Sequence, residues 1–144
     1  MTGDRTFPAV APSVSAARSF VAESLAGSPL DLLDDVQLMV SELTTNVIRH
    51  ALTSFRVAIH HSRKEILVEV TDYGGGIPTM RSVRPEAPDG RGLQIVDMLS
   101  TRWGVDGKSD SGKTVWFTRD LAGASEISKP QRNSAMSVAE VCPF

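Results

Sequence analysis

Cysteine is almost absent from this chain of 144 residues. The single one, Cys142, lies close to the C-terminal end. One cysteine cannot form an intramolecular disulfide, and it cannot build a cysteine-rich metal site. The absence of a disulfide framework is typical of a reducing compartment. We therefore expect a cytoplasmic protein.

Long apolar runs and an excess of basic residues are also missing. No stretch of about 18 apolar residues occurs, and residues 1–10 lack a basic start followed by an apolar segment, so we expect neither a membrane span nor a usual export signal. Lys and Arg number 15 against 17 Asp and Glu, a net charge of -2. No basic face of the size that nucleic-acid binding needs is expected.

What the sequence does contain is the pattern of one globular domain, with 41% hydrophobic and 22% charged residues. Apolar residues at helical spacing predict helices over 13–25, 30–52 and 93–99. Alternating residues predict strands over 6–10, 55–60, 66–71, 102–105 and 113–119. Pro8 places the first strand at a sheet edge.

These elements predict an α+β fold: a two-layer α/β sandwich with a mixed, mostly antiparallel sheet and helices on one face. The domain covers 1–121. Between Tyr73 and Gly92 the sequence is rich in Gly and Pro, which predicts a surface loop. From Ala122 to Phe144 small and polar residues follow without a period, which predicts a disordered tail.

Glu42 and Asn46 stand four residues apart in the second predicted helix, so they share one face, a turn apart. A carboxylate can take a proton from an attacking hydroxyl, and an amide oxygen is a suitable ligand for Mg²⁺. The alternative for Glu42 is an ordinary solvated helix residue. Asn is a poor helix former, so something polar should face Asn46.

Asp72 follows the strand predicted over 66–71, and three glycines, at positions 74, 75 and 76, come soon after it. A carboxylate fixed there can accept a hydrogen bond from the exocyclic amine of a base such as adenine, and glycines let a flat base approach the backbone. The alternative is an Asp-initiated turn.

A Gly-x-Gly pattern, Gly90 and Gly92 around Arg91, precedes the predicted helix over 93–99. The free amides and the positive dipole end of a helix start favour an anion such as phosphate. Arg91 either adds charge to that anion site or is a solvated loop residue.

In this order, Glu-x-x-x-Asn, Asp-x-Gly-x-Gly, Gly-x-Gly-Leu and Gly112-Lys113-Thr114, the motifs resemble the nucleotide-binding domain shared by gyrase B subunits, histidine kinases, MutL and large heat-shock chaperones, the GHKL type. The resemblance spans about residues 5–121 and is nearest to small bacterial anti-sigma-factor serine/threonine kinases. It implies ATP and Mg²⁺ as cofactors, Glu42 as the catalytic base and Asn46 as the metal ligand. It further implies nucleotide contacts from Asp72, Gly74, Gly76, Ile77, Gly90, Arg91, Gly92, Leu93 and Thr114.

The resemblance implies a kinase that phosphorylates an antagonist protein and binds a sigma factor, and it leaves a homodimer open. The segment 79–89 is short and contains Pro85 and Pro88, so closure over a triphosphate does not follow from the motifs. The alternative function is therefore a nucleotide-responsive partner-binding module without kinase activity.

The sequence also matches the phosphate-loop motif of a different ATPase fold, because Gly107 to Thr114 satisfies Gly-x₄-Gly-Lys-Thr. That loop must open a helix, whereas Val115 to Thr118 is strand-like. We therefore predict that this segment is no phosphate loop but the Gly-, Asp- and Ser-rich turn that joins the strands over 102–105 and 113–119.

Overall fold

The computed structural model describes residues 3–51, 53–74, 89–109 and 112–121. Three helices and five strands follow one another in this part of the chain. Their bounds are β1 Gly3–Phe7, α1 Pro12–Ser24, α2 Leu30–Asn46, the π-helical turn η1 Val47–Ala51, β2 Phe55–His61, β3 Glu65–Asp72, α3 Asp89–Leu99, β4 Arg102–Ser109 and β5 Gly112–Asp120.

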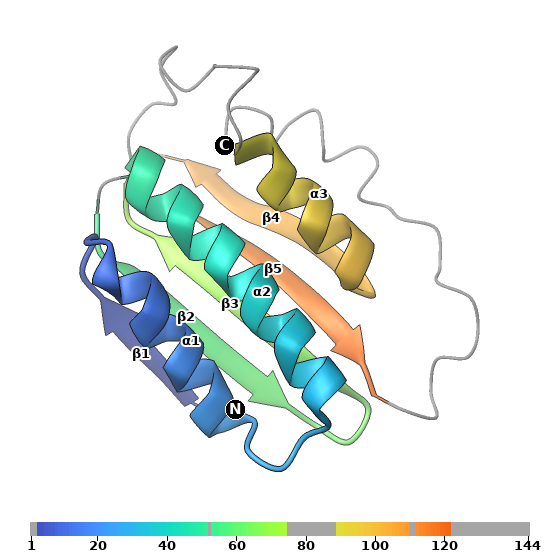
Figure 1. The fold of residues 1–144 in the computed structure, drawn as a ribbon. Helices are drawn as coiled ribbons and strands as arrows, with labels where there is room; N and C mark the ends of the chain where they lie inside the picture. The colour runs from blue at the N-terminus through green and yellow to red at the C-terminus, as the bar shows by residue number, and fades with distance from the viewer. Residues whose placement is uncertain (1–2, 52, 75–88, 110–111, 122–144) are drawn as a thin grey trace.

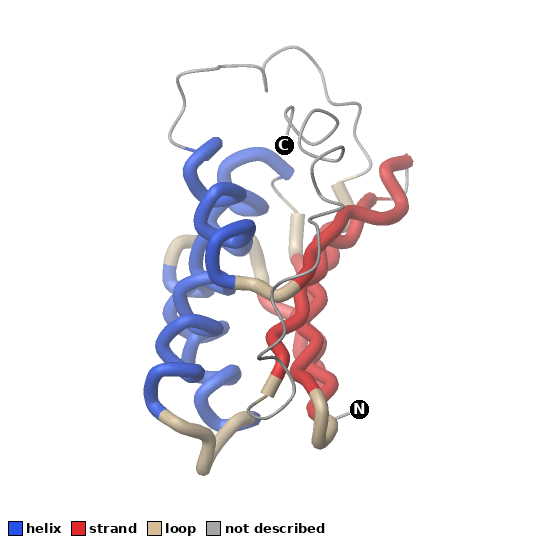
Figure 2. Tube along the Cα trace, turned by 90° about the vertical axis from the view of Figure 1, so that its right-hand side faces the viewer, coloured by secondary structure: helices blue, strands red, loops and turns tan. Residues whose placement is uncertain are grey.

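The strands form a single sheet in the order β1-β2-β3-β5-β4. Each neighbouring pair in it is antiparallel. The three helices cover one face of this sheet, with α1 on the β1 side, α2 across the middle and α3 on the β4 side (Figure 1). Figure 2, turned by 90°, shows helices and strands as two separate layers. The predicted α+β two-layer sandwich is confirmed, and its described pairings are antiparallel throughout.

Several predicted boundaries shift, and among the strands β1 begins at Gly3 rather than at 6 and β4 ends at Ser109 rather than at 105. The first strand was expected over 6–10, yet β1 ends at Phe7, because Pro8 has no N–H to donate to a ladder. The second helix was expected to run to 52, but its α-helical part ends at Asn46 and a π-helical turn follows. The third helix begins at Asp89 rather than 93.

The edge strand β1 is tied to β2 by an ion pair as well as by its ladder. Arg56 Nε donates to Asp4 Oδ2 at 2.7 Å. This hydrogen bond raises the pKa of the Arg56 guanidinium, which stays charged at every pH of interest.

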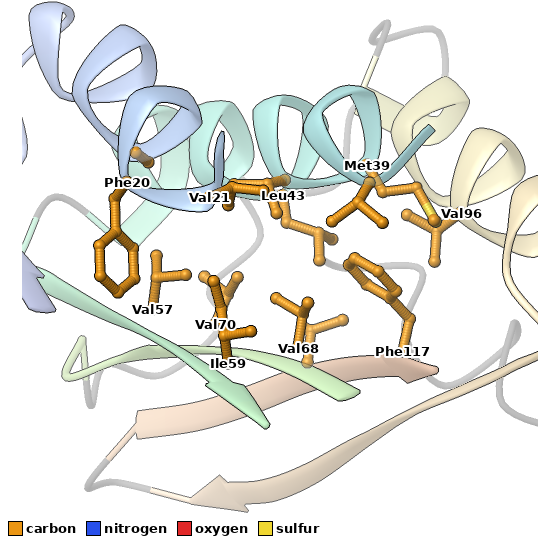
Figure 3. Close-up of a cluster of buried hydrophobic side chains, with 14 of the residues drawn as sticks. Phe20, Val21, Met39, Leu43, Val57, Ile59, Val68, Val70, Val96 and Phe117 are labelled. Carbon is orange, nitrogen blue, oxygen red and sulfur yellow. The ribbon is translucent and has the colours of Figure 1, made fainter. Parts of the chain in front are cut away.

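The core lies between the layers, where apolar side chains of the helices meet those of the strands (Figure 3). Met39 and Leu43 of α2 are fully buried, as are Val68 of β3 and Phe117 of β5. Each such side chain stabilises the fold by about 1.5–3 kcal/mol. Because Leu43 directly follows Glu42 in α2, core packing fixes the rotation of the helix that carries the first motif.

Among the described helices, none combines the length and the apolar character that a membrane crossing requires. The expected disordered tail, 122–144, and most of the expected surface loop, 75–88, lie outside the described residues. Gly76 and Ile77, two of the expected nucleotide contacts, therefore lie outside them as well.

Candidate functional site

The C-terminal part of α2, continued by η1, forms the wall to which the other motifs are attached. Glu42 is half-buried and Asn46 is only 3% exposed. The two residues stand about one turn apart on the same helix face, as their spacing predicts. After Asn46 the helix widens into the π-helical turn Val47–Ala51. Such turns inside α-helices occur frequently at functional sites.

Asn46 carries a buried polar atom without a partner, because its Nδ2 makes no hydrogen bond. Leaving a buried amide unsatisfied costs about 1–3 kcal/mol. A half-turn of the amide exchanges Oδ1 and Nδ2 without changing its shape, so either atom can meet a ligand there. The sequence predicted a polar group opposite Asn46. Within the described residues, Nδ2 has no hydrogen-bond acceptor.

Gly92 brings the start of α3 directly onto this wall. A Cβ atom at position 92 would lie 3.3 Å from Glu42 Oε1 and 3.4 Å from Asn46 Nδ2. Any larger side chain would therefore press on both polar groups. The absence of a side chain at Gly92 therefore lets the first turn of α3 pack closely against Glu42 and Asn46.

Asp89, Gly90, Arg91 and Gly92 are the first four residues of α3, so their N–H groups have no partner within the helix. The Gly-x-Gly pattern thus lies inside the first turn and does not precede it. These amides and the helix dipole favour an anion. Leu93, in contrast, is 9% exposed and belongs to the hydrophobic core.

Asp72, the last residue of β3, is 3% exposed, and both its oxygens have hydrogen-bond partners. Oδ1 accepts from the N–H of Gly74 at 3.0 Å. Oδ2 accepts from Lys113 Nζ, also at 3.0 Å. A Cβ atom at Gly74 would lie 3.2 Å from that of Ala51 in η1. The Asp72 turn is therefore packed against the same wall that Gly92 contacts, which brings the three motifs together.

Thr114, which was expected to contact the nucleotide, does not lie beside Asp72. In the β3–β5 ladder Asp72 pairs with Lys113 and Thr71 pairs with Thr114. The Thr71 and Thr114 hydroxyls share a hydrogen bond of 2.7 Å on the sheet face away from the helices. Sequence reasoning missed Lys113. The sequence held part of the signal, because alternation with the buried Val115 and Phe117 places Lys113, and not Thr114, on the face toward the helices.

The second phosphate-loop pattern, Gly107 to Thr114, lies in a strand pair. β4 extends to Ser109 and β5 begins at Gly112, so no helix follows the Lys113-Thr114 dipeptide. The prediction that a strand and not a helix follows this segment is confirmed, whereas the predicted turn is shorter than expected, because β4 continues to Ser109.

A divalent cation would fit this site only with help from a ligand. Within the described residues, no group of three or more His, Cys, Asp or Glu side chains could hold a metal ion. Mg²⁺ is commonly bound by one or two protein groups together with phosphates and water. With its amide turned by half a turn, Asn46 would present Oδ1, the oxygen that Mg²⁺ requires, next to a helix start that favours phosphate.

A family model of the histidine kinase-like ATPase domain matches residues 7–119. No curated protein matches the chain. The matched range covers most of the sequence and contains Glu42, Asn46, Asp72 and Gly92, the residues that the fold assembles around the end of α2. This chain therefore belongs to the histidine kinase-like ATPase domain family and is a GHKL-type ATPase domain.

Proposed function

We propose that this chain is an ATP- and Mg²⁺-dependent serine/threonine protein kinase of the anti-sigma-factor type, with an antagonist protein as its substrate. Membership of the family already implies nucleotide binding. One observation carries the finer proposal: Gly92 packs against both Glu42 and Asn46, with its Cβ position 3.3 Å and 3.4 Å from their polar atoms. The Glu42 carboxylate and the Asn46 amide thus both lie next to the first turn of α3.

In this proposal each group has a separate task in phosphoryl transfer, which depends mostly on positioning and charge stabilisation. Glu42 orients the acceptor hydroxyl and accepts its proton. The amides of Asp89 to Gly92 bind phosphate oxygens at the start of α3. Asn46 holds Mg²⁺, which supplies charge neutralisation on the phosphates when bound.

The remaining parts of the proposal concern place and partners. We infer a cytoplasmic protein, consistent with the single cysteine of the sequence. Its partners are a sigma factor and an antagonist protein, and a homodimer is compatible with this role. Nucleic acid is not a partner, since the net charge of the chain is -2.

The test compares wild-type protein with Glu42→Gln, using radiolabelled ATP and partner proteins captured from the source cell. Loss of the base should lower transfer by about 10²–10⁴-fold. Nucleotide affinity, measured by calorimetry, should stay within about twofold of wild type. Asp34→Asn is the control, because Asp34 is an exposed carboxylate on the same helix.

Two results contradict the proposal. Transfer by Glu42→Gln at the wild-type rate would remove Glu42 as the base. A labelled product that is lost in acid would indicate phosphohistidine, and hence transfer to a histidine in trans rather than to serine or threonine.

A second function, a nucleotide-responsive partner-binding module without kinase activity, is favoured by the ion pair of Asp72 with Lys113. A carboxylate whose two oxygens are already engaged is poorly suited to tight, continuous binding of a base. In this case calorimetry would show ATP and ADP binding, partner affinity would differ between the two nucleotides, and no phosphoprotein would form.

A further inference from the structure

The buried carboxylate of Asp72 is covered by a cation from its own chain. Lys113 Nζ donates to Asp72 Oδ2 at 3.0 Å, and the side chains are 25% and 4% exposed. The lysine therefore reaches solvent and the carboxylate does not. The ammonium group therefore engages Asp72 Oδ2, the oxygen that is not bound by the N–H of Gly74.

The backbone around the pair holds Lys113 in this position. Gly112 has φ of +110°, and a Cβ atom there would overlap the carbonyl oxygen of Asp72, so β5 starts in close contact with the end of β3. On the other side of Lys113, the hydroxyls of Thr114 and Thr71 are 2.7 Å apart. The register that pairs Asp72 with Lys113 is thus fixed by the residues on both sides.

From this geometry we propose that Lys113 is a built-in competitor for the nucleotide base at Asp72. The inference deepens the proposed function and rests on its nucleotide site. Both the base amine and the lysine ammonium would make a charge-assisted hydrogen bond to the same carboxylate, but only the ammonium carries a full positive charge, which adds a Coulomb attraction to Asp72. The amine reaches Asp72 Oδ2 only after Lys113 has moved away from it.

The competition lowers nucleotide affinity by a population factor. If the base binds only the lysine-displaced state, the apparent dissociation constant rises by the inverse of that state's population. Minor states of folded proteins are populated at about 0.1–10%. Removing the ammonium should therefore tighten ATP binding by about tenfold or more.

The experiment measures ATP dissociation constants by calorimetry for the full chain and four variants. Lys113→Met keeps most of the side-chain length without charge, Lys113→Gln retains a neutral donor, and Lys113→Arg retains the charge. Arg119→Met is the matched control, because Arg119 lies on the same strand and face, is also 25% exposed, and pairs with Asp35 at 2.7 Å. Thermal unfolding of each variant without nucleotide is recorded in parallel.

Lys113→Met should bind ATP at least about tenfold more tightly than wild type. We expect Lys113→Gln to lie between the two, and Lys113→Arg and Arg119→Met to stay within about threefold of wild type. Lys113→Met should also melt at a lower temperature without nucleotide, because it leaves the buried Asp72 carboxylate without its cation. Lys113→Gln keeps a hydrogen-bond donor at Asp72 and serves where Lys113→Met does not fold.

Equal or weaker ATP binding by Lys113→Met, or by Lys113→Gln in its place, overturns the inference, because the lysine would then be neutral or would assist the base. If the Lys113 variant binds ATP equally or more weakly while the wild type still transfers phosphate, only the inference about Lys113 fails and the proposed function stands. If the Lys113 variant binds ATP more tightly but no phosphoryl group is transferred to any captured partner, the kinase proposal fails and the inference about Lys113 stands. An absence of ATP binding in wild type and all variants overturns both.

Discussion

Replacing Asn46 with Leu should make the nucleotide-free protein more stable while removing its metal-assisted function. Asn46 is 3% exposed and its Nδ2 has no hydrogen-bond partner. An unsatisfied buried amide costs about 1–3 kcal/mol, and Leu is the better helix former by about half a kcal/mol. The Leu side chain differs in shape from the planar Asn amide, and this poorer fit in the packed core offsets part of the gain.

The net gain should be about 1–2 kcal/mol, which raises the midpoint of thermal unfolding by about 3–10 °C for a domain of this size. Circular dichroism without nucleotide measures this shift, and calorimetry with ATP and Mg²⁺ measures the loss of affinity. Such a substitution trades function for stability, as is common at active sites.

Thr44→Val is the matched control, because Thr44 is fully buried on the same helix but its hydroxyl donates to the carbonyl oxygen of Val40 at 2.9 Å. Its removal should change stability by less than about 1 kcal/mol and should leave nucleotide affinity unchanged. A clearly lower melting temperature for Asn46→Leu would refute the reasoning, since it would show that the amide is satisfied and structural.

Three further outcomes follow from the same geometry. Gly112→Ala should lower the free energy of unfolding by about 2 kcal/mol or more, measured in denaturant, because its positive φ and its contact with Asp72 exclude a Cβ; an unchanged midpoint would contradict this. Gly92→Val should weaken ATP binding at least about tenfold and lower the free energy of unfolding by about 1–3 kcal/mol, because its methyl groups press on Glu42 and Asn46. Removing Mg²⁺ with EDTA should weaken ATP binding by wild type but not by Asn46→Leu, and equal losses would argue against Asn46 as the metal ligand.

Most of the fold follows from short-range patterns, because the period of apolar residues reports which face of an element is buried. The alternation in 55–60 and 66–71 predicted the strands β2 and β3, and the helical spacing of apolar residues predicted α2, whose buried face contains Val36, Met39, Val40 and Leu43. The end of α2 was less predictable. An α-helix and a π-helical turn present similar apolar spacing over a few residues, so η1 leaves no clear sequence signal.

The base end of the site was only partly predictable, because it depends on pairing between strands that are far apart in sequence. Asp72 was identified from its own strand, but its partner was set by the register of β3 with β5. A shift of one residue would place Thr114 rather than Lys113 beside Asp72. The close contact at Gly112 fixes that register, and no local pattern in either strand reveals it.

The two ends of the site differ in how far the protein satisfies its own polar groups. At the α3 end, Asn46 Nδ2 is buried without a partner and a helix start offers free amides. At the Asp72 end, both carboxylate oxygens already have partners. Binding at the first end gains interactions that the free protein lacks, whereas binding at the second exchanges one hydrogen bond for another. The free energy of nucleotide binding should therefore come mainly from the phosphates and their metal ion, with the base held weakly for as long as Lys113 is present.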